Sequence, residues 1–507
     1  MISQILSLPL PILFCLFFLI LLVIWKKLKT SNSKLLNLPP GPRKFPIIGN
    51  IPQLIGGLPH HKRKELADKY GPVMHLQIGE VPTVVVSSAE SAKQVLQTHD
   101  IIFANRPLIL AADVMFYKAA DIGFARYGES FKQLKKICML ELFSPNSVQL
   151  FRPIREQETS NLMRSVTAGA GSPINLTKML HFLSCTIIVR AAFGDKCPMD
   201  REAFIPLAQD VLKAASGLCI ADLFPSLKWL HGIAGFQYGL RNLHKKIDLV
   251  LEKIINEHRI LRAQNNTDKN KNLVHVLLNY QEQGNLEHPL TIENIKAVIL
   301  DLFIAGTDTS SITTEWVMSE LIKNPKVMQK AQAEVRKVFD GKRNIDETMI
   351  SELTYLKLVI KESLRLHPSV PLLVPRESSK HCEIGVYDIP AQTRVFVNTW
   401  ALGRDPKYWF ESEKFLPERF IDNPINFKGG NFEFLPFGSG RRICPGYLFG
   451  LASVELVLVH LLYYFDWELP DGEKKEDLDM AEEFGAVTTR KNNLYLIPIP
   501  CHEFPTD

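Results

Sequence analysis

The chain begins with a continuous apolar run, and the pattern of polar positions changes sharply after it. Residues 5–25 are almost all apolar and none is charged, which is about the length that a helix needs to span a bilayer. Lys26, Lys27 and Lys29 follow at once, and a basic flank of this kind stays on the cytosolic side. The pattern predicts a membrane anchor over residues 1–29, with the rest of the chain in the cytosol.

A proline-rich connector follows this anchor. Four prolines fall between residues 39 and 46, and clustered prolines make a stiff, non-helical backbone. We therefore divide the chain into the anchor, a basic and proline-rich hinge over residues 30–50, and a body over residues 51–507.

Strand patterns in the body are confined to two short regions. Residues 73–78 and 83–87 are rich in β-branched residues, and residues 79–82 between them predict a turn. A second strand-rich patch covers residues 382–397. Most of the remaining sequence has helical periodicity, beginning with a helix over residues 60–69. The body is therefore predicted to be mainly α with a small β region.

Two segments of the body lack a clear period. Residues 104–126 are irregularly apolar and residues 263–272 are polar, so both are predicted to be loops. A helix over residues 128–140 follows the first of them.

The longest predicted helix covers residues 291–322 and has an unusual centre. It begins at Thr291 with an imperfect cap. Residues 305–311, with the sequence AGTDTSS, are mostly modest or poor helix formers. Such residues lower the stability of a buried helix, so their presence usually indicates a functional role. One face of the helix, at i, i+4 spacing, carries Asp301, Ala305 and Thr309.

Charge and cysteine content exclude some functions. Lys and Arg number 59 and Asp and Glu 54, for a net charge of +5. This balance does not indicate a nucleic-acid-binding protein, which usually carries a concentrated basic patch. The eight cysteines are scattered without a CxxC pair. The absence of such a pair argues against a zinc site, and the scatter favours reduced thiols in the cytosol.

The strongest candidate for chemistry is Cys444, in the stretch FLPFGSGRRICPG over residues 434–446. Gly438 and Gly440 allow positive φ and a close approach of the backbone to a flat ligand. A buried structural cysteine in a glycine-rich turn is the alternative interpretation.

The sequence after Cys444 predicts how its thiol is displayed. The apolar run over residues 447–465 predicts a helix, with Pro445 at its first position. The N–H groups at the start of this helix, together with Arg441 and Arg442, favour a thiolate over a thiol. A thiolate held in this way is a good ligand for iron.

Five residues of this stretch carry a family resemblance. The spacing of Phe437, Gly440, Arg442, Cys444 and Gly446 resembles the haem-ligand signature of the haem-thiolate monooxygenases, the cytochrome P-450 superfamily. The resemblance covers nearly the whole chain and is closest to plant microsomal members that oxidise terpenes. It implies the cytochrome P-450 fold and bound haem b, with Cys444 as the axial ligand of the iron.

A nucleotide site is not predicted in the same stretch. Gly438 and Gly440 begin like a dinucleotide loop, but Ile443 stands where the third glycine would be.

The resemblance also implies roles in the central helix and at the haem edge. Thr309 and Asp308 would hold dioxygen and deliver protons, and the small side chains of Ala305 and Gly306 would leave room for the cofactor. Arg376 would meet a haem propionate. The implied network that supports the cysteine loop consists of Glu362, Arg365 and Arg419.

The helix over residues 128–140 departs from the family pattern. The family usually has Trp and Arg where this chain has Phe131 and Lys135, which would also meet a propionate. Phe131 lacks an indole N–H and Lys135 lacks the guanidinium fork, so we expect a weaker clamp on the propionate. Lys132, Lys135 and Lys136 predict either a docking surface for an acidic redox partner or an ordinary solvated face.

The positions expected to face the substrate are nearly all apolar, which predicts an apolar substrate held by shape. They are Leu302, Phe303, Ala305, Val370, Leu373, Val374, Ala486 and Val487.

Together with the predicted anchor, the resemblance implies a monooxygenase of the endoplasmic reticulum membrane that acts on a sesquiterpenoid or diterpenoid. It would use O2 and would receive electrons from NADPH through a cytochrome P-450 reductase, with cytochrome b5 as a further partner. Two alternatives remain: a haem-thiolate isomerase or lyase that needs no O2, against which Thr309 argues, and a non-catalytic membrane protein that binds haem or a partner.

Overall fold

The computed structural model describes residues 36–504, except for residues 195–205, 208–209, 212, 215–218, 228–235, 264–271, 343–344 and 486. The predicted membrane anchor over residues 1–29 lies outside the described residues, as does most of the predicted loop over residues 263–272.

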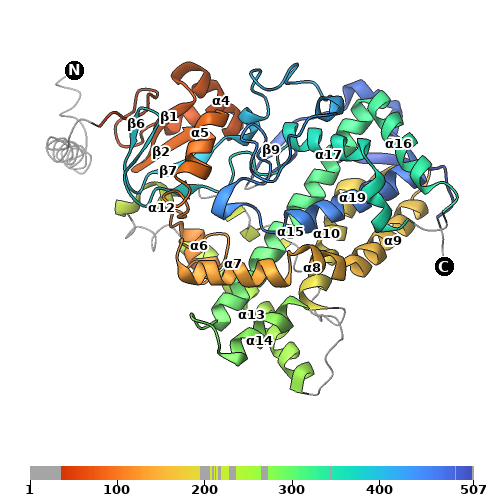
Figure 1. The fold of residues 1–507 in the computed structure, drawn as a ribbon, viewed down its shortest axis with the longest axis horizontal. Helices are drawn as coiled ribbons and strands as arrows, with labels where there is room; N and C mark the ends of the chain where they lie inside the picture. The colour runs from red at the N-terminus through yellow and green to blue at the C-terminus, as the bar shows by residue number, and fades with distance from the viewer. Residues whose placement is uncertain are drawn as a thin grey trace, which may run out of the picture.

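Helices form most of the described chain, and the strands gather mainly on one side of it (Figure 1). The α-helices are α3 (Ile51–Leu54), α4 (Pro59–Tyr70), α5 (Ala89–Lys93), α6 (Leu110–Met115), α7 (Glu129–Glu141), α8 (Pro145–Leu150), α9 (Arg152–Ala168), α10 (Leu176–Phe193), α12 (Ile220–Leu223), α13 (Phe236–Ala263), α14 (Leu273–Gln283), α15 (Ile292–Lys323), α16 (Pro325–Phe339), α17 (Tyr355–Leu366), α18 (Thr399–Leu402) and α19 (Tyr447–Tyr464). The prediction of a mainly α fold with a small β region is confirmed.

The largest sheet has the strand order β1-β2-β7-β4, and three smaller sheets accompany it. The strands are β1 (Val73–Ile78), β2 (Val81–Val86), β3 (Ile174–Asn175), β4 (Arg376–Glu377), β5 (Cys382–Ile384), β6 (Tyr387–Ile389), β7 (Arg394–Val397), β8 (Phe465–Glu468), β9 (Glu482–Phe484), β10 (Thr488–Arg490) and β11 (Tyr495–Pro500). Strands β5, β6 and β7 account for the predicted strand-rich patch over residues 382–397.

The hairpin of β1 and β2 is tighter than the sequence predicts. Ile78 pairs with Val81, so the turn consists of two residues, and Pro82 already lies in β2 opposite Gln77. Gly79 has φ +62°, and two-residue hairpins need such a positive φ. The prediction that the turn extends to Pro82 is wrong.

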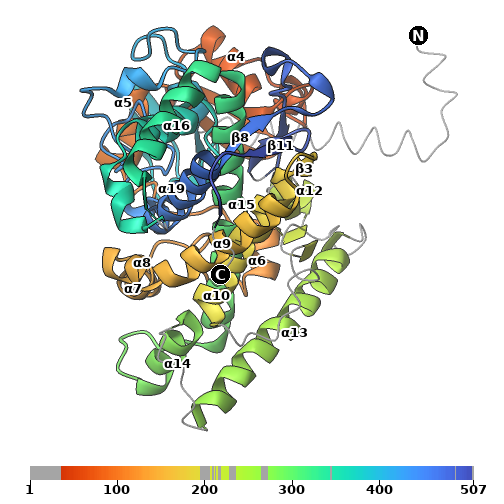
Figure 2. The ribbon, with the colours of Figure 1, turned by 90° about the vertical axis from the view of Figure 1, so that its right-hand side faces the viewer.

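Helix α15 forms the centre of the helical part. It packs against α10 and α19, and Figure 2 shows it passing between elements from both halves of the chain. Its first turn is better capped than predicted, because Thr291 and Asn294 make a complete capping box. The amide of Asn294 takes the place of the usual Glu or Gln.

Two described helices, α10 and α19, are long and apolar enough to cross a membrane. Most of the apolar window of each is buried within the protein, and residues of both belong to the main hydrophobic core. The apolar character of these two helices is therefore explained by core packing.

Two predicted boundaries differ from the structure. The predicted loop over residues 104–126 contains the short helix α6, whose Ala111, Ala112 and Met115 are buried. Helix α19 begins at Tyr447 with Gly446 as its N-cap. Pro445 therefore lies before the helix and does not occupy its first position.

The proline-rich segment is bound to the β region from Asn37 onward. The backbone N–H of His75 donates to Pro40, and a Cβ on Gly41 would lie 2.0 Å from the carbonyl oxygen of His75. Asn50, fully buried, accepts from the backbone N–H of Gln77 at 2.7 Å. This part of the predicted hinge is held by contacts with the strands as well as by its prolines.

We predict that Asn50→Ala releases this segment. The change leaves the half-buried N–H of Gln77 without its side-chain acceptor and the carbonyl of Pro42 without its donor, at a cost of about 1–3 kcal/mol. Limited proteolysis will show faster cleavage between residues 37 and 50. Gln53→Ala, which removes one exposed hydrogen bond to Arg43, is the control. Equal cleavage rates in the two variants would contradict the prediction.

Candidate functional site

The loop before α19 presents Cys444 through a closed backbone turn. The N–H of Cys444 donates to the carbonyl of Phe437 at 3.0 Å. Gly438 and Gly440 have φ of +69° and +70°, and a Cβ on Gly440 would lie 2.4 Å from the carbonyl oxygen of Leu96. The conformation therefore favours glycine at both positions, and Gly440 is also required for space.

The surroundings of the Cys444 sulfur differ from the prediction. Burial raises the pKa of the thiol, while the N–H of Gly446 and the charge of Lys135 lower it. The side chain of Arg441 is directed to Asp100 and Tyr127. The predicted support of the thiolate by Arg441 and Arg442 is wrong; Lys135 and the start of α19 supply it.

Arg442 is held by backbone carbonyls and an aromatic ring. It donates to the carbonyls of Ala104, Ile122 and Ala125. Its guanidinium carbon lies 3.8 Å from the ring centroid of Phe131, within the range of a cation–π contact. Phe131, where the family usually has Trp, thus positions Arg442.

Several cations gather beside the cysteine loop. Burial and then the repulsion of Arg442 lower the pKa of Lys135 to about 8, and burial and then Arg376 lower the pKa of Arg442 to about 10. Arg106 is also buried and repelled by these arginines. Such a cluster has an excess of positive charge that two carboxylates would relieve. The residues present therefore fit a haem, with Arg376, Arg442 and Lys135 as the side chains that would hold its propionates.

The predicted lysine surface is only partly present. The ammonium of Lys135 donates inward to the carbonyl of Arg441 at 2.6 Å. Lys132 is exposed but paired with Glu129 at 2.6 Å, and Lys136 is exposed. Lys135 is therefore a residue of the site and not of a docking surface.

Asp100 organises the cysteine loop and was not among the predicted site residues. It is 5% exposed and accepts hydrogen bonds from the guanidinium of Arg376 at 3.0 Å and from the backbone N–H of Arg441 at 2.9 Å. Arg376 also donates to the carbonyl of Ser439 at 2.7 Å. No local motif surrounds Asp100, so only the close approach of residues far apart in the sequence shows its role.

Glu362, Arg365 and Arg419 come together as predicted from the resemblance. Arg365 donates two hydrogen bonds to the Glu362 carboxylate, both at 2.8 Å, and Arg419 adds a third at 2.9 Å. Glu362 and Arg365 are 0% and 1% exposed. Bidentate arginine–carboxylate pairs are directional, so this network fixes the backbone that surrounds it.

The network reaches the cysteine loop through aromatic rings. Arg365 donates to the carbonyls of Gly403 and Ser412 and lies over the ring of Trp409. Trp409 contacts Phe434 with ring centroids 6.2 Å apart, and Phe434 begins the cysteine loop. Through these contacts the Glu362 network can support the cysteine loop, as the resemblance implies.

In α15, Asp308 and Thr309 at the polar centre both have hydrogen-bond partners. The hydroxyl of Thr309 donates to the carbonyl of Ala305 at 2.7 Å, and Ala305 itself is exposed within a mostly buried helix. Asp308 lies 2.5 Å from the Nε2 of His181 in α10. His181 has no signal in the sequence, because it acts only through the contact of two helices.

Gly306 serves helix packing. A Cβ there would lie 2.5 Å from the Cδ1 of Ile188 in α10. Gly306 was expected to leave room for the cofactor. In the structure it instead allows α15 to pack closely on α10.

Asp301 holds the loop before α7. Its carboxylate accepts from the N–H of Ile122 at 2.8 Å and of Gly123 at 3.1 Å. Burial, followed by the neighbouring Asp121, raises its pKa well above the ordinary value. Asp301 therefore holds this loop against α15. Its role is structural, whereas Thr309, on the same face of the helix, is a candidate catalytic residue.

The predicted substrate positions separate into groups. Phe303 is 1% exposed in the main core, which removes it as a pocket candidate, and Leu302 packs against the same core. Val370 and Val487 lie together beside Trp316.

Of the remaining substrate candidates, Leu373 and Val374 are described by the structure and Ala486 is not. Leu373 has φ +52° and its side chain approaches Gly438, while Val374 is 36% exposed. Ala486 lies outside the described residues. A cavity of about 270 Å³ lies between residues 106–126 and α7 and includes none of the predicted substrate positions.

Comparison with known proteins gives a consistent result. Residues 39–497 match the family model described as Cytochrome P450. The chain is 52% identical to desmethyl-deoxy-podophyllotoxin synthase of Sinopodophyllum hexandrum, over 96% of each chain. It is 49% identical to premnaspirodiene oxygenase of Hyoscyamus muticus, over 95% of this chain and 97% of the relative. The corresponding values for 5-epiaristolochene 1,3-dihydroxylase of Nicotiana tabacum are 48%, 95% and 97%.

Solved structures show the same fold. A zebra fish cytochrome P450 with progesterone superimposes with a TM-score of 0.75 at 26% sequence identity, over 88% of this chain and 100% of that chain.

We predict that Glu362→Ala loses haem. The change leaves Arg365 as a buried charge without its carboxylate, which costs about 3–5 kcal/mol, and loosens the path to Phe434. Haem content per purified chain will fall strongly. Glu352→Ala, at an exposed glutamate, is the matched control. Full haem occupancy in the folded Glu362 variant would rule out the supporting role.

Proposed function

This chain belongs to the cytochrome P450 family and is a monooxygenase; on that premise we propose that it inserts one oxygen atom from O2 into an apolar terpenoid of plant specialised metabolism. The observation that carries the proposal is the presentation of Cys444 beside a cluster of largely buried cations. Relatives at about 50% identity are named as an oxygenase and a dihydroxylase.

Cofactor binding follows from the residues around the cysteine loop. Haem bound through Cys444 would supply the redox chemistry that activates O2, since thiolate donation favours O–O cleavage. Arg376, Arg442 and Lys135 would hold the propionates, and the Glu362 network would keep the loop in place. The protein contributes binding, orientation and electrostatics.

Proton delivery is proposed for the polar residues of α15. His181 is 19% and Asp308 15% exposed in their side chains, so the pair lies between solvent and the buried face of the helix. His181 Nε2 would pass a proton to Asp308 Oδ1, and Asp308 would pass it toward the hydroxyl of Thr309.

The substrate class rests on two supports. The accessible candidate positions, Ala305, Val370, Leu373 and Val374, are all apolar, which suits a hydrocarbon held by shape. Two relatives carry the names of premnaspirodiene and 5-epiaristolochene. Another is named for desmethyl-deoxy-podophyllotoxin, which gives a second candidate class of substrate.

The electron source and location are proposed from the sequence. The chain has no predicted nucleotide-binding loop, so electrons would come from NADPH through a separate reductase, with cytochrome b5 as an additional donor. The apolar run over residues 5–25 would anchor the protein in the endoplasmic reticulum membrane. The cytosolic body would then face the reductase.

The proposed function is tested with the full-length chain and a plant reductase in yeast microsomes. Sesquiterpene, diterpene and podophyllotoxin-type candidates are supplied with NADPH and isotopically labelled O2. Label in a product that forms only with NADPH supports the proposal, and the substrate that reacts assigns the class. Turnover of a hydroperoxide without NADPH would instead indicate an isomerase or lyase. Failure of a haem-loaded protein to oxidise any candidate would oppose it.

We predict that the Asp308–His181 pair sets how efficiently electrons form product. Asp308→Asn removes the acid and lowers turnover by about 10²-fold, a usual value for a lost general acid. His181→Phe lowers it less and increases the NADPH consumed per product. His381→Phe, at another histidine–aspartate pair 2.8 Å apart, is the control. Unchanged coupling in His181→Phe would contradict the proposed relay.

A further inference from the structure

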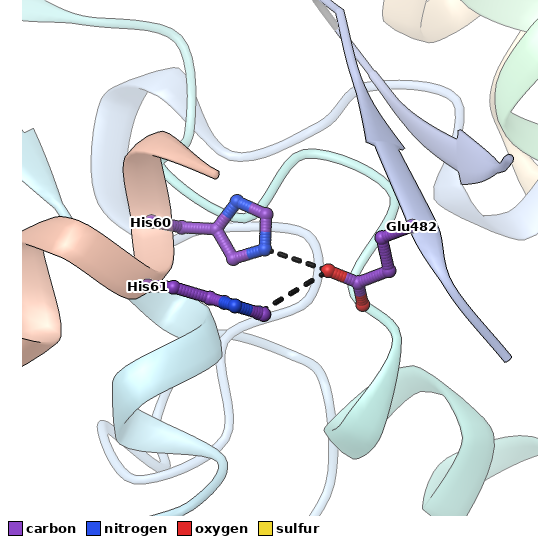
Figure 3. Close-up of side chains that lie close together, drawn as sticks. All are labelled: His60, His61 and Glu482. Atoms are coloured by element: carbon purple, nitrogen blue, oxygen red, sulfur yellow. Dashed lines mark hydrogen bonds and ion pairs between the residues drawn. The ribbon is translucent and has the colours of Figure 1, made fainter. Parts of the chain in front are cut away.

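Two histidines from the first turn of α4 meet a carboxylate of β9 (Figure 3). The Nε2 of His60 lies 2.8 Å from Glu482 Oε2, and the Nε2 of His61 lies 3.4 Å from the same oxygen. These ligand atoms all lie within 4.8 Å of one another. Among the described residues, this is the one group of three or more His, Cys, Asp or Glu side chains that meets this geometry.

The cluster contains buried nitrogens that the protein does not satisfy. The side chains of His60 and Glu482 are 0% and 7% exposed. The Nε2 of His61 is buried without a hydrogen bond, and so are the Nδ1 atoms of His60 and His367 and the Nε1 of Trp400. Buried polar atoms are normally paired with protein, water or an ion. Their concentration around one carboxylate indicates that something besides the chain completes this site.

We propose that His60, His61 and Glu482 form a zinc site. Two imidazole nitrogens and one carboxylate are a common zinc donor set, and a water takes the fourth position. Donors bound tetrahedrally at about 2.0 Å lie about 3.3 Å apart, and the two measured separations of 2.8 and 3.4 Å bracket that value. Nitrogen donors also make the site poor for Mg²⁺ and Ca²⁺.

The surroundings orient the donors. The second oxygen of Glu482 lies 3.6 Å from the Nδ1 of His367, whose Nε2 is 2.7 Å from Glu320. The ring of His61 packs on Trp400 at 4.1 Å between centroids. Such outer partners fix the rotamers of metal ligands. The expectation that the chain holds no zinc site depended only on the absence of CxxC pairs, and a site of this kind needs no cysteine.

A metal here would join elements far apart in the sequence. Helix α4 follows the proline-rich segment, while β9 pairs with β10 close to Val487. Zinc would therefore brace the β9–β10 hairpin against α4, next to a candidate substrate position. The proposal does not depend on which substrate the protein oxidises.

The first test measures zinc on the full-length, haem-loaded protein. The protein carries no polyhistidine tag, is stripped with a chelator, and is titrated with zinc sulfate by calorimetry. We expect one zinc per chain, and an X-ray absorption spectrum at the zinc edge with two imidazoles and oxygen neighbours near 2.0 Å. The haem iron does not interfere at this edge. No saturable zinc uptake, or a sulfur shell around the metal, would overturn the proposal.

The second test uses variants. His61→Phe keeps a ring on Trp400 and removes the donor nitrogen, so zinc affinity will fall at least about 10-fold. His381→Phe, which alters a histidine–aspartate pair without a third ligand, will bind zinc as the parent does. Glu482→Gln will also lose affinity, with haem content as the check on folding. Equal affinity in His61→Phe and the parent would overturn the proposal.

Discussion

A thiolate ligand in a protein interior is possible only where the loop that carries it is held rigidly and its charge is balanced. In this chain the Cys444 loop is held from two directions. On one side, Asp100 accepts hydrogen bonds from the side chain of Arg376 and the backbone N–H of Arg441. On the other, the Glu362 network fixes the segment that contacts Phe434. The charge is balanced by Lys135 and by the N–H groups at the start of α19.

The same constraint explains why α15 tolerates poor helix formers. Two residues at its centre make contacts that the helix alone would not provide. Gly306 admits Ile188 of α10, and Asp308 meets His181. The hydroxyls of Ser311 and Thr313 donate hydrogen bonds to backbone carbonyls one turn earlier in the same helix. Tertiary packing therefore outweighs local propensity here, as it does in most buried helices.

What could be predicted from the sequence depended on whether the signal was local. Long periodic segments such as α15 and α19 were predicted to within a few residues, because their hydrophobic pattern repeats many times. The β1–β2 turn was misjudged because Pro82 is tolerated inside a strand. The family spacing of Glu362, Arg365 and Arg419 placed them correctly in one network. The directions of Arg441 and Arg442 and the roles of Asp100 and His181 were missed, since they depend on residues that meet only in the folded chain.

The central claim is that Cys444 is the axial ligand of a haem iron. The most direct measurement is the carbon monoxide difference spectrum of the reduced full-length protein, compared between the parent and Cys444→Ser. The account predicts that the parent gives the spectrum characteristic of thiolate ligation and that the variant loses it, because a hydroxyl replaces the sulfur donor. An unchanged spectrum in Cys444→Ser would contradict the account.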